Sequence, residues 1–246
     1  MGSDASRTSS AGDGGRTTAD APVLPPGTLE DGESVLVAGR SMVGKQRVGY
    51  RLLGDAPRTG SAAYCVTTSD PADHARDRFA AVAPDGARLR VVDCLTGAGG
   101  TVAPGSGPDD RVDDDTWYVS SPGDLTGIGV AVTKALGATP EARRPRSRVL
   151  IDSVSTLLLY ADMETVYRFL HTLVGRVKTV DGHVVSILHT DALDDRTRAT
   201  LVQLFDLVVD VRSPDGTTTE VRVRGRPDLD SSWRPLDADG GGERSP

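Results

Sequence analysis

The middle of the chain alternates short apolar runs with segments in which apolar residues recur at helical spacing. The apolar runs predict strands at 34–39, 61–68, 89–94, 116–121, 183–190 and in the first half of 147–160. Helices are expected from the mid-forties to Leu53 and over 71–83, 122–137, 163–179 and 194–205. This alternation predicts an α/β domain with a mainly parallel sheet and helices on both of its faces.

The last two apolar runs are connected differently. Residues 206–212 and 217–226 flank the sequence SPDG, which is typical of a tight turn. We therefore expect an antiparallel hairpin at the C-terminal end of the sheet.

Three segments show no apolar periodicity. Residues 1–22 and 237–246 are rich in Gly, Ser and Asp, and residues 97–115 form a glycine-rich, acidic stretch. Such segments cannot bury enough apolar surface to offset their ordering entropy. We therefore expect a single domain at 23–236 that contains a disordered acidic loop, with a disordered tail at each end.

A phosphate-binding loop pattern follows the first predicted strand. Residues 39–46 read GRSMVGKQ and match G-x-x-x-x-G-K-[ST] at every fixed position except the last. In such a loop, successive backbone N–H groups and the N-terminus of the next helix hold phosphate oxygens. The candidate nucleotide contacts are Gly39, Arg40, Ser41, Met42, Val43, Gly44, Lys45 and Gln46. The alternative interpretation is a tight strand-to-helix turn without a ligand.

Gln46 stands where the pattern has Ser or Thr. The hydroxyl at that position normally ligates Mg²⁺. The Gln46 side-chain oxygen is a candidate ligand too, but its longer arm places the oxygen elsewhere. We expect the substitution to weaken the metal site more than the phosphate site.

A second acid follows the strand at 147–151. The sequence RVLIDSVS places Asp152 directly after this strand, which is where a nucleotide site of this type needs an acid to hold Mg²⁺ directly or through water. Gln46 and Asp152 are therefore the candidate metal ligands. The alternative for Asp152 is the N-cap of a helix that begins at the end of the strand.

These motifs and their surroundings resemble the RecA/KaiC superfamily of P-loop ATPases. The resemblance is carried by VLIDSVSTLL, by HVVSILHTDALDDRTRATLVQLFDLVVDVR, and by VSSPGDLTGIGVAVTKAL, which is similar to a haloarchaeal KaiC-like subgroup. It covers about residues 27–226 and implies a RecA-like P-loop NTPase core that binds ATP or another NTP, with Mg²⁺. It also implies that the strand at 183–190 lies between the strands at 34–39 and 148–152.

The resemblance assigns further positions. The end of the strand at 183–190 would face the γ-phosphate, which makes His189 and Thr190 candidate sensors or a hydrogen-bonded pair without a ligand. Active members carry a catalytic glutamate near the end of the second strand, where this chain has YCVTTSDP. Asp70 is the nearest acid and the candidate catalytic base, although an aspartate before Pro71 can also cap the next helix.

The composition is unusual in the kinds of charged residue used. Asp provides 29 of the 35 acidic residues, Arg provides 25 of the 28 basic ones, and the net charge is −7. This bias favours a salt-adapted, haloarchaeal proteome, with the GC content of the genome as the alternative cause. The negative charge disfavours broad binding to nucleic acid or anionic lipid. The acidic loop and the scarcity of aromatic residues also disfavour a recombinase.

The sequence shows neither an apolar run long enough to span a membrane nor an N-terminal secretory signal, so we expect a cytoplasmic protein. Cys65 and Cys94 lie in apolar strand-like runs without CxxC spacing. We interpret both as buried small hydrophobic residues.

The leading hypothesis is a KaiC-like nucleotide-binding protein in signalling or regulation, with slow or absent hydrolysis. The alternatives are an active ATPase of the same superfamily and a protein-interaction module that keeps only the fold. The expected partners are the nucleotide and either a second copy of the chain or a regulatory protein. If the site lies between subunits, Arg222, Arg224 and Arg226 are candidates by position to reach a neighbouring site.

Overall fold

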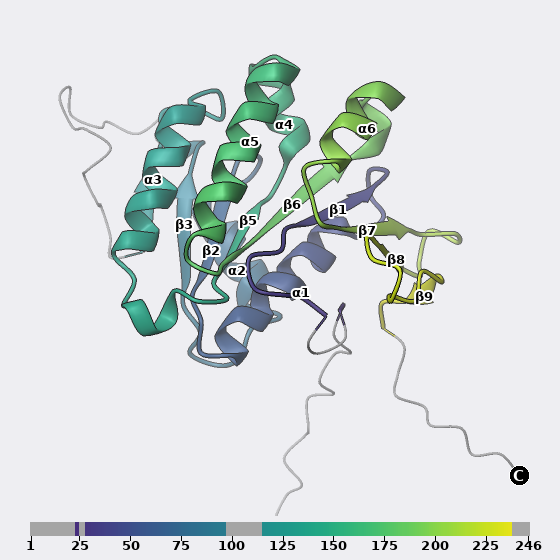
Figure 1. Ribbon diagram of the computed structural model, residues 1–246, viewed down its shortest axis with the longest axis horizontal. Helices are drawn as coiled ribbons and strands as arrows, with labels where there is room; N and C mark the ends of the chain where they lie inside the picture. Colours follow the sequence, from purple (N-terminus) through teal and green to yellow (C-terminus); the bar gives the residue numbers. More distant parts are fainter. Residues whose placement is uncertain (1–22, 25–27, 97–114, 238–246) are drawn as a thin grey trace, which may run out of the picture.

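The computed structural model describes residues 23–24, 28–96 and 115–237 (Figure 1). The strands are β1 (Val35–Gly39), β2 (Ala63–Thr67), β3 (Leu89–Asp93), β4 (Thr116–Tyr118), β5 (Arg148–Ile151), β6 (His183–His189), β7 (Leu207–Arg212), β8 (Glu220–Arg224) and β9 (Arg234–Pro235). The helices are α1 (Lys45–Arg58), α2 (Ala72–Ala80), α3 (Leu125–Gly137), α4 (Val154–Tyr160), α5 (Met163–Lys178) and α6 (Asp195–Val202), with the 3₁₀ turns η2 (Glu141–Arg143) and η3 (Thr190–Ala192).

One sheet runs through the whole domain in the order β4-β3-β2-β5-β6-β1-β7-β8-β9. The strands from β4 to β7 pair in parallel, so their carboxyl ends meet at one edge. β6 lies between β1 and β5, with Gly39 paired to His189 and Ile151 paired to Ser186. This arrangement confirms the predicted order, in which the Asp152 strand is near the phosphate-loop strand but not next to it.

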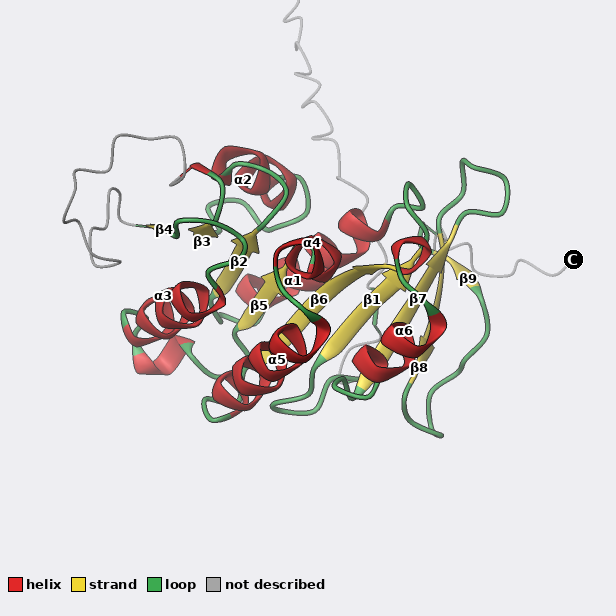
Figure 2. Ribbon diagram, turned by 90° about the horizontal axis from the view of Figure 1, so that it is seen from above, coloured by secondary structure: helices red, strands yellow, loops and turns green. Residues whose placement is uncertain are grey.

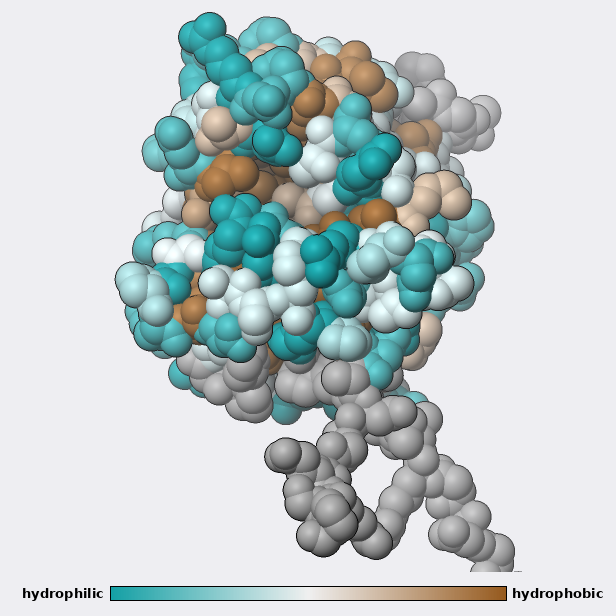
Figure 3. All heavy atoms as spheres, turned by 90° about the vertical axis from the view of Figure 1, so that its right-hand side faces the viewer, coloured by the Kyte–Doolittle hydropathy of each residue, from teal (hydrophilic) through white to brown (hydrophobic). Residues whose placement is uncertain are grey.

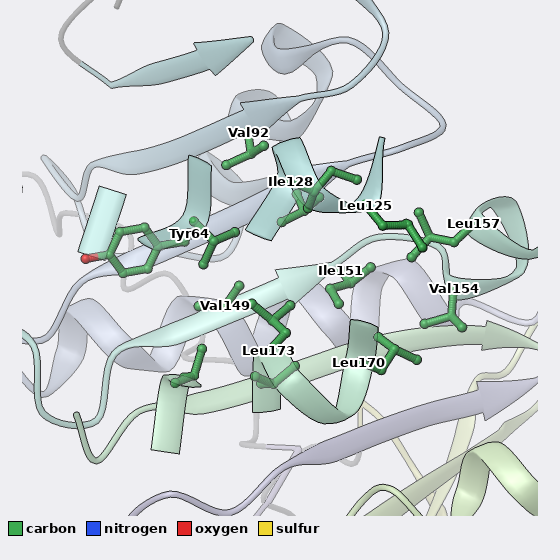
Figure 4. Close-up of a cluster of buried hydrophobic side chains, with 14 of the residues drawn as sticks. Tyr64, Val92, Leu125, Ile128, Val149, Ile151, Val154, Leu157, Leu170 and Leu173 are labelled. Atoms are coloured by element: carbon green, nitrogen blue, oxygen red, sulfur yellow. The ribbon is translucent and has the colours of Figure 1, made fainter. Parts of the chain in front are cut away.

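Helices cover both faces of the sheet (Figure 2). Side chains of α1 and α2 form one apolar cluster with the sheet, and those of α3, α4, α5 and α6 form the other. Figure 4 shows the second cluster, where Ile128, Ile151, Leu170 and Leu173 converge from two helices and a strand. Burial on both faces explains why these strands read as continuous apolar runs rather than alternating ones.

The predicted C-terminal hairpin is present. β7 and β8 pair in antiparallel fashion, and β9 adds a short further strand that the sequence pattern did not predict. Trp233 packs against the guanidinium groups of Arg212 and Arg222, whose carbon atoms Cζ lie 4.1 and 4.6 Å from the ring centre. Figure 3 shows this side of the molecule, where hydrophilic residues cover most of the surface between smaller hydrophobic areas.

The second half of 147–160 is the short helix α4, for which the sequence analysis made no separate prediction. Cys65 and Cys94 are both buried and both belong to the apolar clusters, as expected of small hydrophobic residues.

The expected disordered segments at 1–22 and most of 97–115 and 237–246 lie outside the described residues. At their edges, the carbonyl of Asp115 accepts from Val91 N–H at 2.8 Å. Asp237 pairs with Arg47 and Arg51 of α1, each at 2.6 Å. Across the described ranges, every helix is too short or too polar to cross a membrane.

Two leucines give a matched test of this core. Leu170 on α5 is fully buried, whereas Leu159 on α4 is 83% exposed. Leu170→Ala should lower the free energy of unfolding by about 2–5 kcal/mol, because it removes buried methyl groups and leaves a cavity. Leu159→Ala should change it by less than about 0.5 kcal/mol. Chemical denaturation of both variants checks this, and equal effects would contradict the placement of α5 on the sheet.

Candidate functional site

The loop between β1 and α1 has glycines at two positions where the backbone requires them. A Cβ on Gly39 would lie 2.4 Å from the carbonyl oxygen of Val211 on the neighbouring strand, so only glycine fits there. Gly44 has a φ of 87°, a left-handed conformation that glycine adopts without a steric penalty. The helix α1 starts at Lys45, and its first N–H groups have no earlier carbonyl in the helix to bond. The loop therefore ends in a positive helix terminus at the carboxyl edge of the sheet.

The Lys45 side chain lies back against this loop. It is 3% exposed, and its Nζ donates to the carbonyl oxygen of Arg40. Burial lowers the pKa of Lys45 to about 8, and the negative charge of Asp191 opposes that shift. The ammonium group is thus held inside the curve of the loop, where a phosphate would meet it.

Asp191 contacts the loop and was not among the predicted site residues. Its carboxylate accepts from the backbone N–H of Ser41 at 3.1 Å and from the Ser41 hydroxyl at 3.1 Å. These bonds, chiefly the one from the backbone N–H, lower the pKa of Asp191. An anionic group of the protein itself therefore occupies a donor of the phosphate loop.

A signal for Asp191 was present in the sequence. The predicted neighbourhood of β6 and β1 places the residues just after His189 beside the loop that follows Gly39. Asp191 is the first acid after that strand end. An acidic side chain at this strand end was therefore the signal for a contact with the loop.

The structure places His189 and Thr190 at the end of β6, as predicted. The backbone N–H of His189 donates to the Ser155 hydroxyl at 3.0 Å. Burial and the nearby charge of Lys45 lower the pKa of the His189 imidazole. Thr190 opens the 3₁₀ turn η3, which carries Asp191 to the loop. The strand end thus lies at the loop, with His189 in electrostatic reach of Lys45.

Asp152 is fully buried at the end of β5. Its Oδ1 accepts from the Thr68 backbone N–H at 2.8 Å and from the Thr68 hydroxyl at 2.7 Å. Its Oδ2 is buried and has no hydrogen-bond partner within the described part of the chain. Burial raises the pKa of Asp152 to about 6, against the hydrogen bonds from Thr68. The N-cap of α4 is Ser153, so the alternative interpretation of Asp152 as a helix cap is wrong.

Asp70, which precedes α2, is held by a residue of that helix. Its Oδ2 accepts from Arg78 Nη1 at 2.5 Å. The N-cap of α2 is Pro71, and the backbone N–H of Ala72 donates to Asp93 at 3.0 Å. The interpretation of Asp70 as the helix cap is therefore wrong, because Asp93 from the next strand bonds the first amide of α2. Asp70 lies at the carboxyl end of β2, near the position of the expected catalytic acid, but it is paired with a cation.

The remaining loop residues differ in exposure. Met42 is 98% exposed with a φ of 64°, and Arg40 is also exposed. The Val43 carbonyl accepts from the Thr219 hydroxyl at 3.5 Å, which ties the loop to the hairpin. Gln46 lies half-buried in the first turn of α1. The structure therefore brings all eight loop residues together at one edge of the sheet.

The three arginines named for a neighbouring site are occupied within the chain. Arg222 and Arg224 both bind the Asp210 carboxylate, at 2.8 and 2.6 Å. Arg226 pairs with Glu30 at 2.9 Å and with Glu33 at 3.2 Å. Each would have to leave an ion pair to reach another subunit.

The donor set fits a phosphate group better than it fits a metal ion. Gly39, Gly44 and the start of α1 form a backbone cradle, and Lys45 supplies positive charge within it. For Mg²⁺, the unpartnered Oδ2 of Asp152 is a suitable oxygen ligand, held directly or through water. Position 46 lacks the hydroxyl that usually completes such a metal site.

Comparisons with known proteins agree with this architecture. Residues 32–211 match the model of a family described as "Family of unknown function (DUF7504)". The chain belongs to this family. A search of curated proteins gives no match.

Among solved structures, a KaiC-like protein from the hyperthermophilic archaeon Pyrococcus horikoshii OT3 is similar, with a TM-score of 0.55 and 14% identity over 83% of this chain and 85% of that one. The fold of this DUF7504 member is therefore RecA-like, as predicted: a mainly parallel sheet, helices on both faces and an antiparallel C-terminal hairpin.

The raised pKa of Asp152 predicts a pH-dependent stability. Between pH 4 and 6 the native carboxyl group keeps a proton that the unfolded chain releases, so stability falls as the pH rises through about 6. Asp152→Asn keeps an oxygen for Thr68 but does not titrate. Between pH 5 and pH 8, the free energy of unfolding of the wild-type protein should fall by about 1–2 kcal/mol more than that of this variant.

Urea denaturation at both pH values measures this difference. Asp195→Asn, at an exposed position on α6, is the control and should follow the wild type. If the wild type and Asp152→Asn lose the same stability between pH 5 and pH 8, the Asp152 carboxylate has a partner that lowers its pKa.

Proposed function

We propose that this protein binds a nucleoside triphosphate, such as ATP, at the loop 39–46 and hydrolyses it slowly or not at all. The observation that carries the proposal is the loop itself. Gly39 leaves no room for a side chain, Gly44 takes a left-handed turn, and Lys45 Nζ lies against the Arg40 carbonyl at the start of a helix. The RecA-like fold supports it, because P-loop NTPases hold the β- and γ-phosphates at a loop with this G-x-x-x-x-G-K pattern.

When ATP is bound, the loop amides and the α1 terminus would hold the phosphates, and Lys45 would neutralise their charge. Lys45 would exchange its bond to Arg40 for phosphate oxygens. Phosphate charge would raise the Lys45 pKa again, since it favours the protonated amine. Asp152 would hold a Mg²⁺ ion, directly or through water, and the ion would neutralise part of the phosphate charge.

Slow hydrolysis follows from two positions. Gln46 offers no hydroxyl to Mg²⁺, and the end of β2 offers Asp70, which Arg78 holds at 2.5 Å, in place of a free glutamate. Both groups would act on charge that develops in the transition state. Removal of one such interaction commonly costs about 10²–10³ in rate. The active-ATPase alternative would need another group to orient the water.

A role in regulation or signalling fits a protein that binds a nucleotide without rapid turnover. The nucleotide would then stabilise one conformation of the protein rather than drive a cycle of hydrolysis. A second copy or a regulatory protein would bind that conformation. The bias to Asp and Arg supports a haloarchaeal, high-salt setting, and the nucleotide assays of this subsection are therefore set in concentrated KCl.

Calorimetric titration with ATP, with and without Mg²⁺, tests the proposal. Wild-type protein should bind ATP in the micromolar to millimolar range, and Lys45→Ala should abolish binding, because it removes the buried cation of the loop. Lys178→Ala, another lysine at the end of α5, is the matched control and should bind like the wild type. A thermal melt of each variant confirms that it is folded.

Turnover is measured in the same buffers by phosphate release. We expect less than about 0.1 per second, against a median of about 10 per second for enzymes. Faster turnover that is lost in Lys45→Ala would make the protein an ordinary ATPase. Absence of binding at millimolar ATP would reject the nucleotide site and leave the interaction-module alternative.

Asp191 provides a second prediction. Its carboxylate lies at the loop and would repel bound phosphates. Asp191→Asn keeps an oxygen for Ser41 but removes the negative charge, so it should bind ATP about 3- to 10-fold more tightly. Asp195→Asn, on the nearby helix α6, is the matched control for removal of one surface charge. Calorimetry with and without Mg²⁺ separates two roles. Weaker binding of Asp191→Asn only when Mg²⁺ is present would show that Asp191 holds the metal instead of competing with phosphate.

A further inference from the structure

A groove runs between α3 and α5, which lie side by side on one face of the sheet (Figures 1 and 2). It has a volume of about 620 Å³. Leu125 and Leu173 line its floor and also belong to the core, while Phe169 is partly buried and Val130 is 38% exposed. The groove therefore carries apolar surface that opens to solvent, away from the phosphate loop.

The residues that α3 presents to the groove follow the spacing of a helix–helix contact. They include Thr126, Gly129, Val130 and Thr133, which stand at positions i, i+3, i+4 and i+7. On a helix this spacing produces a single stripe.

The lining residues of α5 repeat the same spacing. Thr165, Arg168, Phe169 and Thr172 stand at i, i+3, i+4 and i+7, and Arg176 continues the stripe one turn further. Two parallel stripes of this kind form the seat that a third helix occupies when helices pack together. The groove is thus shaped for a helix of about four turns, ~20 Å long.

Gly129 determines the depth of this groove at its middle. A Cβ added there would have Phe169 as its nearest neighbour, at 4.0 Å, so the position lies at the groove surface without being crowded. A larger side chain would project into the groove rather than into the core. Small residues at such positions allow the backbone of a docked helix to approach closely.

The charge of the groove is opposite to that of the protein. Lys134, Arg168 and Arg176 line it, and no Asp or Glu is among its lining residues within the described part of the chain. The whole chain carries a net charge of −7. Glu164 contacts Arg168 at 3.6 Å in an exposed pair, which is a weak interaction. A concentration of cations beside exposed apolar surface favours an acidic partner.

We propose that the α3–α5 groove binds an acidic amphipathic helix of a partner protein. Apolar side chains of that helix would enter between Leu125, Val130 and Phe169, and its Glu or Asp residues would face Arg168 and Arg176. This is the helix-in-groove mode of recognition, in which anchors recur at i, i+3, i+4 and i+7. The inference is independent of nucleotide binding, because none of these residues belongs to the phosphate loop.

A displayed library of helical peptides tests the proposal. Each peptide is about 15 residues long, ~22 Å of helix, with Leu or Phe fixed at i, i+3, i+4 and i+7. The flanking positions are randomised among Glu, Lys, Gln and Ser. Selection on the full-length protein in moderate salt should enrich Glu at the flanking positions. Enrichment of Lys, or no preference, would overturn the proposal.

Variants of the protein then localise the selected peptide. Gly129→Leu fills the groove and should weaken binding at least about tenfold, and Arg168→Glu should do the same through charge. Gly175→Leu is the matched control on α5, since a Cβ there meets no atom within 4 Å. Arg198→Glu on α6 is the charge control. Both controls should bind within about twofold of the wild type, and equal loss in controls and groove variants would overturn the proposal.

Two other occupants give distinct results. If the groove joins two copies of the chain, sedimentation will show a wild-type dimer that Gly129→Leu converts to a monomer. If it binds an anionic membrane, vesicles of phosphatidylserine will compete with the selected peptide. Either result would overturn the assignment to an acidic helix of a partner. So would selected peptides that do not depend on Gly129, because Lys134 and Arg176 would then serve only the last turns of their own helices.

Discussion

The close approach of Gly39 to the carbonyl of Val211 is the constraint on which the site depends. β1 lies between β6 and β7, and a side chain at Gly39 would separate β1 from β7. Because β1 is held at this distance, its loop turns within reach of the end of β6 on one side and of the hairpin on the other. The contacts from Asp191 and Thr219 to the loop both follow from this packing.

The groups that would serve a nucleotide are held by the protein itself. Lys45 bonds the Arg40 carbonyl, Asp191 bonds Ser41, and Arg78 holds Asp70. Under the proposed function, a triphosphate must replace the first two contacts before it can use the loop. Binding would therefore move η3 relative to the loop, and that movement is a physical route by which an occupied site differs from an empty one.

The sequence was sufficient for the strands, the helices and the loop, because these depend on local patterns: continuous apolar runs, helical spacing, and two glycines before a lysine. The place of β6 between β1 and β5 was predicted from the family resemblance instead. It was not sufficient for hydrogen-bond partners. Asp70 and Asp152 were both given helix capping as the alternative role, but Asp93 bonds the first amide of α2 and Ser153 caps α4. These choices depend on which strand ends lie side by side and on small differences in backbone direction, which no local pattern contains. Asp191 was missed for another reason: the predicted strand order placed it beside the loop, but the end of β6 was considered only for a sensor role.

The central claim is that the loop is a nucleotide site that the protein's own groups occupy until a nucleotide replaces them. A structure of the protein with a non-hydrolysable ATP analogue tests it most directly. The account predicts phosphate oxygens within hydrogen-bond distance of the amides of the loop 39–46, with Lys45 released from Arg40 and Asp191 released from Ser41. A structure with saturating analogue in which Asp191 still bonds Ser41 and the analogue lies elsewhere would contradict it.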